Sequence, residues 1–258
     1  MKKLILLFVI VVAFFAVAYL RNQPQIIKVD LPPPQAFEEF VVEDENIDVI
    51  EEEIEEIVIE EEIIEPEPEL ASVNLAVPFT SQAPSYNWDQ PFQDACEEAS
   101  LIMIDYYYQD KELPPPLQIE DILLDMIGWQ QDNWDGHFNL SVDKVVEFAG
   151  IYYDYDIEVV KDLTTDKIED YLDRGLPIVI PADGHILEQP YFTNDGPDYH
   201  MLVIKGYIDG NFITNDPGTW RGADFIYSYE NMMASIMDWD TKKASATGPK
   251  QGLVLLKK

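Results

Sequence analysis

The sequence predicts an α+β domain, because its helical patterns come mostly before its strands. Apolar residues recur at helical spacing in four segments, at residues 95–108, 118–127, 141–149 and 165–174. Short apolar strand patterns follow, at residues 177–181, in a hairpin at 201–214, and at 253–257. A parallel α/β sheet would instead require strands and helices to alternate along the chain.

Composition limits the number of domains and the kind of partner. The chain has 258 residues, 47% of them hydrophobic, which is enough for one well-cored domain. Its formal net charge of -34 repels phosphate backbones and anionic lipid headgroups. We therefore expect no nucleic-acid partner.

The N-terminal residues 1–21 have the pattern of a membrane segment. Lys2 and Lys3 precede an unbroken apolar run at residues 4–20. Positive charges before such a run favour a cytoplasmic N-terminus, so we expect a single-pass signal-anchor that holds the rest of the chain on the extracytoplasmic side of the cell membrane. Ala16 and Ala18 also fit the cleavage pattern of a signal peptide, and cleavage at Ala18 would release a secreted protein.

Residues 22–71 predict an acidic linker that is rich in proline and glutamate and disordered. No basic residue interrupts the acidic stretch between Glu38 and Glu69. Isoleucines at helical spacing, including Ile47, Ile50 and Ile54, could line a helix seam, but like charges one turn apart oppose that helix. A weak coiled coil or a cation-binding tract is the alternative. We place the folded domain at residues 72–258.

Within this domain, local signals set the expected boundaries of each element. A short apolar strand is predicted at residues 73–79, and a loop leads from it to the first helix. Asp94 stands at the expected N-cap of that helix, and Gly150 is a stop signal for the third one. The fourth helix is expected to begin after Thr164 and to stop at Gly175.

Cys96 is the single cysteine of the chain and lies in the first turn of a predicted helix. A lone cysteine is usually a small buried hydrophobic residue. An exported protein, however, has little use for an unpaired thiol unless the thiol reacts. A helix N-terminus can lower a thiol pKa from about 8.5 to between about 3.5 and 7.5. Cys96 is therefore a candidate nucleophile.

His200 is the candidate base, and the hairpin that follows it offers a third residue. With a two-residue turn at Asp209-Gly210, Asn215 would share the face of His200. With a three-residue turn and a bulge at Gly210, Asp216 would take that place. The Ile-Asp-Gly sequence suits the three-residue turn, so we expect Asp216 and keep Asn215 as the alternative.

These residues and their order resemble a known family. The motifs are VPFTSQAP, ACEEAS, LPIVIP, YHMLVIKGY and NDPGT, spread over residues 73–258. Together they resemble the papain superfamily, and within it the bacteriocin-processing peptidases that cleave double-glycine leaders and the exported bacterial proteins similar to them. The resemblance implies a papain-like cysteine peptidase fold. In that fold, the cysteine helix of an N-terminal helical part packs on an antiparallel sheet that carries the histidine and the aspartate.

The resemblance also implies a role for each site residue. Cys96 would be the nucleophile, His200 the base that forms an ion pair with it, and Asp216 the group that orients the imidazole. Gln82 would donate to the oxyanion beside the Cys96 backbone N–H. Gln90 competes for this role because it lies closer to Cys96 along the chain.

No cofactor or metal is expected. His137 and His185 lie in loops, and no metal-ligand spacing joins them to another histidine or cysteine. Two features depart from the resembled peptidases. Glu97 and Glu98 follow the cysteine, where they either oppose the thiolate or point away from it. The chain also contains no transporter domain, whereas those peptidases are commonly fused to one.

The expected function is that of a membrane-tethered, extracytoplasmic cysteine peptidase. It would hydrolyse peptide bonds of a peptide or protein substrate through a thioester intermediate at Cys96, His200 and Asp216. Two alternatives remain from the sequence. One is a papain-fold module without catalytic activity that binds at the cell surface, and the other is an amidase that acts on cell-wall peptides.

Overall fold

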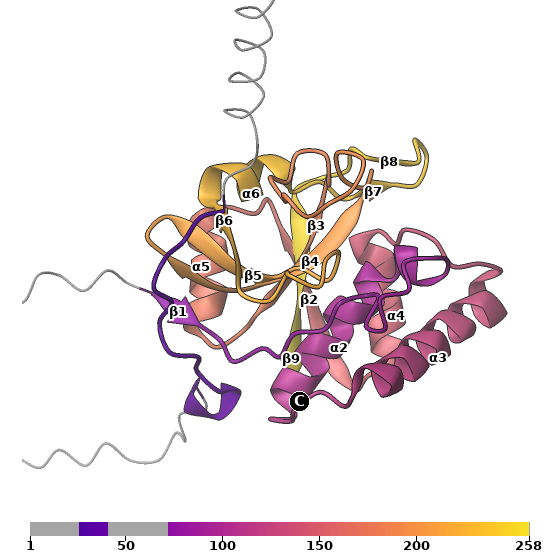
Figure 1. Ribbon diagram of the computed structural model, residues 1–258, viewed down its shortest axis with the longest axis horizontal. Helices are drawn as coiled ribbons and strands as arrows, with labels where there is room; N and C mark the ends of the chain where they lie inside the picture. Colours follow the sequence, from indigo (N-terminus) through magenta and orange to yellow (C-terminus); the bar gives the residue numbers. More distant parts are fainter. Residues whose placement is uncertain (1–25, 41–71, 258) are drawn as a thin grey trace, which may run out of the picture.

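A computed structural model describes residues 26–40 and 72–257, and its core is one antiparallel sheet with helices packed on it (Figure 1). The predicted α+β class is confirmed. Strands run in the order β2-β9-β3-β4-β5-β6, and β1 pairs with β4 off this path. The strands of this sheet are β1 (Val73–Asn74), β2 (Tyr155–Lys161), β3 (Ile178–Ala182), β4 (His200–Ile208), β5 (Asn211–Asn215), β6 (Phe225–Ser228) and β9 (Gln251–Lys257).

Five α-helices and a small second sheet complete the described part. Helices α2, α3 and α4 lie together at one side of the sheet in Figure 1, with α2 against β4 and α4 against β2. The helices are α2 (Cys96–Tyr108), α3 (Pro116–Trp134), α4 (Val142–Tyr152), α5 (Thr165–Asp173) and α6 (Tyr229–Ser235). Two short 3-10 helices, η1 (Phe37–Phe40) and η2 (Phe92–Asp94), and the pair β7 (Trp239–Asp240) and β8 (Ser245–Ala246) are the remaining elements.

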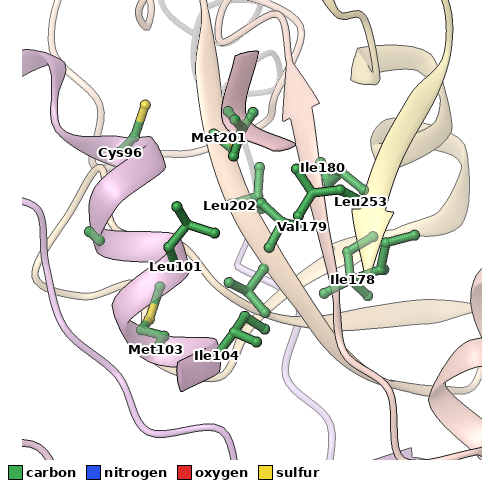
Figure 2. Packing of buried hydrophobic residues seen from close by; sticks show 14 of the residues in the cluster. Cys96, Leu101, Met103, Ile104, Ile178, Val179, Ile180, Met201, Leu202 and Leu253 are labelled. Carbon is green, nitrogen blue, oxygen red and sulfur yellow. The ribbon is translucent and has the colours of Figure 1, made fainter. Parts of the chain in front are cut away.

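The core between α2 and the sheet fixes the position of the cysteine. Leu101 and Ile104 of α2 are fully buried and face the sheet side chains of β3 and β4, among them Val179 and Leu202 (Figure 2). Burial of each such side chain contributes about 1.5–3 kcal/mol to folding. Because these contacts hold α2 in place, the first residue of the helix, Cys96, is held beside the start of β4.

Several element boundaries differ from those expected. Asp94 belongs to η2 and makes no cap, and Ala95 is the N-cap of α2. Helix α4 continues past Gly150, because this glycine does not adopt the left-handed conformation that ends a helix. Thr164 does cap α5 by accepting a bond from the Lys167 N–H, as expected. The strand expected at 73–79 is limited to Val73–Asn74, and β2, β6 and α6 were not predicted.

Part of the predicted linker packs on the domain. Gln35 makes a parallel bridge to Leu75, and its carbonyl accepts the Ala76 N–H at 2.7 Å. Phe37 lies edge-on to Tyr107 and Tyr108 of α2, with ring centroids 5.9 and 4.8 Å away. Gln35 and Phe37 therefore fasten this segment to the end of β1 and to α2. The predicted coiled coil or cation-binding tract falls on residues 41–71, outside the described residues.

The predicted membrane segment also lies outside the described residues. Over residues 26–40 and 72–257, the structure contains no helix with the length and apolar character needed to cross a bilayer. The signal-anchor at residues 1–21 therefore stays a prediction from sequence.

Two glycines provide a matched test of how tightly the sheet edge is packed. A Cβ on Gly206 would lie 2.2 Å from the Val73 carbonyl oxygen of β1, whereas a Cβ on Gly128 of α3 would meet nothing within 4 Å. We predict that Gly206→Ala lowers the free energy of unfolding by about 1–3 kcal/mol. Gly128→Ala should raise it by about 0.5–1 kcal/mol through helix propensity. Chemical denaturation of both variants checks this, and equal effects would contradict it.

Candidate active site

The structure brings Gln82, Cys96 and His200 to one cleft of about 790 Å³. Cys96 is the first residue of α2, and its sulfur points away from the body of the helix (Figure 2). His200 is the first residue of β4, the strand on which α2 packs. The cleft wall combines polar side chains with five aromatic ones, Trp88, Tyr191, Phe192, Tyr199 and Trp220.

Asp216 lies behind His200, away from the cleft surface. Its Oδ1 accepts the His200 Nε2–H at 2.7 Å. The aspartate is fully buried, and the histidine is 2% exposed. A carboxylate at this position fixes the tautomer of the imidazole with the proton on Nε2, so that Nδ1 is the nitrogen that can accept a proton.

Three further donors hold the Asp216 carboxylate. Gln189 Nε2 and the Tyr227 hydroxyl donate to Oδ2 at 3.0 and 2.7 Å, and the Gly218 N–H donates to Oδ1 at 2.9 Å. Burial raises the pKa of Asp216, but the charge of His200 and the bonds from His200, Tyr227 and Gln189 outweigh it, and the net shift is downward. The carboxylate is therefore ionised and fixed. Sequence reasoning missed Gln189 and Tyr227, because neither lies near a recognisable motif.

The hairpin reaches this arrangement by a route that differs from the one expected. Ile208 pairs with Asn211, so Asp209 and Gly210 form a two-residue turn, and both have positive φ. The expected three-residue turn is wrong. A β-bulge at Lys205, between the pairs Ile204–Thr214 and Gly206–Ile213, shifts the register by one residue instead. This bulge is what brings Asp216 to the side of His200.

Asn215, the alternative third residue, has a different place. Its Nδ2 donates to the carbonyls of Val77 and Pro78 at 2.9 and 3.2 Å, and its Oδ1 accepts the Asp224 N–H at 3.3 Å. These bonds tie the segment after β1 to the end of β5. Asn215 therefore supports the hairpin and does not contact His200.

Gln82 lines the cleft, but its amide is already engaged. Nε2 donates to the carbonyls of Phe92 and Gln93 at 3.1 and 2.7 Å, which uses both amide hydrogens, and Oε1 is buried without a partner. Gln82 can donate to an oxyanion only after this amide turns. The competitor Gln90 is farther from such a role, because it donates to Asp94 at 2.7 Å and does not line the cleft.

The thiol of Cys96 does not bond to His200. It donates to Glu97 Oε2 at 3.0 Å. Burial first, and then the charge of Glu97, raise the pKa of Cys96 well above its ordinary value. This direction is opposite to the one expected from the helix N-terminus, because burial disfavours the thiolate and the adjacent carboxylate also points toward the sulfur. Of the two orientations that the sequence left open for Glu97, the structure has the one that opposes a thiolate.

The other two histidines have local partners. His185 is a hydrogen-bonded loop residue at the cleft rim, where its ring nitrogens contact the Asp195 carbonyl and Asp198 Oδ1 at 3.0 and 2.9 Å. His137 lies 3.4 Å from Glu98 Oε1. Across the parts of the chain that the structure describes, no group of three His, Cys, Asp or Glu side chains is placed to hold a metal ion.

The model of the Peptidase_C39 like family matches residues 74–246, which include Gln82, Cys96, His200 and Asp216. The chain belongs to the Peptidase_C39 like family. The resemblance inferred from the motifs is therefore confirmed, and so is the papain-like fold, with its cysteine helix packed on an antiparallel sheet.

Two solved structures are similar to this C39-like chain. One is a proposed C39-like peptidase from Bacillus anthracis, with a TM-score of 0.48 and 16% identity over 73% of this chain and 98% of that one. The other is the peptidase domain of Streptococcus ComA, a bifunctional ABC transporter of a quorum-sensing pathway, with a TM-score of 0.35 and 12% identity over 64% of this chain and 93% of that one. No curated protein matches the sequence.

Removing one donor from Asp216 tests the strength of the buried array. We predict that Tyr227→Phe raises the pKa of Asp216 and lowers the free energy of unfolding at pH 7 by about 1.5–3 kcal/mol, because a bond to a buried charge is lost. An aspartate with a depressed folded-state pKa stabilises the fold above its unfolded pKa, near 3.9, and this contribution is lost as pH falls through the folded value. The difference between the proteins should therefore shrink below about pH 4.

Denaturation at pH 7 and pH 3 measures this difference. Tyr207→Phe is the matched control, since its hydroxyl donates to Asp173 at 2.8 Å in a partly buried pair. The control should change stability by at most about 1 kcal/mol. An equal loss for both variants at both pH values would contradict the account of Asp216.

Proposed function

We propose that this C39-like chain is a cysteine peptidase that is tethered to the cell membrane and hydrolyses peptide bonds on the extracytoplasmic side. One observation supports the chemistry above all. A buried, ionised Asp216 orients His200 at the same cleft that Cys96 lines. A papain-fold module that only binds ligands would not need a buried carboxylate with four donors behind its histidine.

The proposed reaction uses each residue in a defined step. The Cys96 thiol gives its proton to His200 Nδ1, and the imidazolium is stabilised by Asp216. The thiolate attacks the carbonyl carbon of the peptide bond, and the imidazolium protonates the departing amine, which leaves a thioester. His200 then takes a proton from water, whose oxygen displaces the sulfur and releases the acid. The thiol is restored when the proton returns to it.

The oxyanion in these steps needs donors near the sulfur. Cys96 opens α2, so its backbone N–H has no acceptor within the helix and can donate. We assign the second donor to Gln82, whose amide would leave the Phe92 and Gln93 carbonyls when substrate binds. Loss of one such donor costs about 2.7–4 kcal/mol of transition-state stabilisation.

The tether is proposed from the sequence at residues 1–21. Residues 26–40, which follow closely, pack on the domain beside β1. An anchored chain would therefore hold the domain close to the bilayer surface. The substrate class proposed from the family is peptide or protein.

A membrane-impermeant, thiol-directed peptidyl epoxide tests activity and location together. On intact cells that express the full chain, we predict covalent labelling of Cys96, no labelling of Cys96→Ser, and at least a hundredfold slower labelling of His200→Ala, the lower end of general-base contributions of about 10²–10⁴. Gln90→Ala is the matched control and should label normally. Purified protein should cleave a peptide mixture with the same dependence on the three residues.

Different outcomes separate the alternatives. Equal labelling of wild type and His200→Ala would show that the pair does no chemistry and would favour a binding module. Normal labelling in detergent but none on intact cells would contradict the extracytoplasmic location. Cleavage of peptidoglycan fragments alone would favour a wall amidase.

A further inference from the structure

The carboxylate of Glu97 is held directly against the sulfur of Cys96. Its Oε2 accepts the thiol proton at 3.0 Å, and its Oε1 accepts the Leu140 N–H at 2.8 Å. With both oxygens engaged and the side chain 1% exposed, Glu97 has one well-defined position. The proposed nucleophile, Cys96, is therefore hydrogen-bonded to Glu97 and not to its base, His200.

Few groups near Glu97 compensate its charge. Glu98, the next residue on α2, is fully buried and adds a second carboxylate. His137, from the loop after α3, lies 3.4 Å from Glu98. Within the described ranges, no lysine or arginine forms an ion pair with either glutamate. The other titratable groups that face this cluster are Asp94 before α2, His200 on β4, and Tyr199, whose hydroxyl donates to the Leu140 carbonyl and to Asp238.

We propose that the protonation state of Glu97 decides whether Cys96 can act as a nucleophile. When Glu97 is ionised, it keeps Cys96 in the thiol form. When Glu97 is neutral, the thiol proton is free to pass to His200. The inference rests on the proposed function, because it assigns a positioning residue to that same site. It makes the chain a peptidase that works on the acidic side of neutrality.

The proton movements follow from the contacts. In the ionised state, a thiolate at Cys96 would face a carboxylate 3.0 Å away, and the two negative charges repel. A proton from solvent converts Glu97 to the acid. The thiol proton can then pass to His200 Nδ1, and the new carboxyl O–H donates to the sulfur anion that remains. The net result is one proton taken up and an ion pair formed.

The cluster sets the pH at which this change occurs. Burial first, and the charge of Glu98 second, raise the pKa of Glu97 to about 7, against the bonds from Leu140 and Cys96 that lower it. Glu97 is neutral below this value and ionised above it. The reactive ion pair is therefore favoured below about pH 7 and suppressed above it, until the thiol itself loses its proton at much higher pH.

The rate of Cys96 alkylation by iodoacetamide, measured from pH 5 to 9 on the full chain in detergent, tests the proposal. We expect the wild-type rate to fall as pH rises through about 7. Glu97→Gln keeps an oxygen for the Leu140 N–H and resembles the neutral acid. The alkylation rate of this variant should not fall as pH rises through about 7. At pH 8 it should be at least about tenfold higher than the wild-type rate, because pH 8 lies one unit above the pKa of Glu97. At pH 5.5 the two rates should agree within about twofold.

Two further variants make the test specific. Glu98→Gln removes the neighbouring charge but leaves Glu97 in place, so the fall should persist and move to lower pH. His200→Ala should lose the reactivity at low pH. If that reactivity depends on His200 but Glu97→Gln copies the wild-type profile, the role of Glu97 is overturned and the proposed function stands. If Cys96 reacts as a free thiol in every variant, both are overturned.

Infrared spectroscopy gives a readout that does not depend on reactivity or on Glu97→Gln folding normally. The chain has one cysteine, so its only S–H stretching band belongs to Cys96. In the wild type the band should weaken as pH falls through about 7, because the thiol proton passes to His200 once Glu97 is neutral. In Glu98→Gln the midpoint of this change should move to lower pH. A band that stays constant between pH 5.5 and 8 in the wild type would overturn the proposal.

Discussion

The buried carboxylate of Asp216 is the constraint on which the rest of the site depends. A charge removed from water costs several kcal/mol unless donors replace the lost hydration. Here the imidazole of His200 supplies one donor, and Gln189, Tyr227 and the Gly218 N–H supply the others. The same bonds that make burial possible also fix the tautomer of the base, so the stability of the hairpin and the chemistry of the cleft share one origin.

The fold delivers this carboxylate through the pairing of β4 and β5 and not through any single motif. The bulge at Lys205 sets the register, and the buried Lys205 ammonium is itself held by Asn74 Oδ1 of β1 at 2.7 Å and by Asp224. Gly218 then leaves room for the imidazole, since a Cβ there would lie 2.7 Å from His200 Cε1. Helix α2, packed on β4, brings Cys96 to the same place. Glu97 adds a separate control of reactivity, because it contacts the nucleophile Cys96 and not the base His200.

Much of this was predictable from sequence, and the failures have physical reasons. Helical spacing gave α2 and α5 nearly to the residue, and the order of the Cys96, His200 and Asp216 motifs gave the family. A bulge inside a regular apolar strand leaves no local signal, so the reason expected for Asp216 was wrong although the residue meets His200. Gln189 lies in a loop and Tyr227 in the unpredicted strand β6. Their bonds to Asp216 depend on tertiary structure, so no local pattern predicts them. The direction in which Glu97 points was equally undetermined, because side-chain orientation at a helix start depends on Leu140, far along the chain.

The state of His200 tests the central claim most directly. The sequence has three histidines, so nitrogen-15 resonances of a histidine-labelled full chain can be assigned with His137→Gln and His185→Gln. The account predicts that neutral His200 carries its proton on Nε2, bonded to Asp216, with Nδ1 unprotonated and available to the thiol. A neutral His200 with the proton on Nδ1, or one that exchanges freely between tautomers, would contradict it.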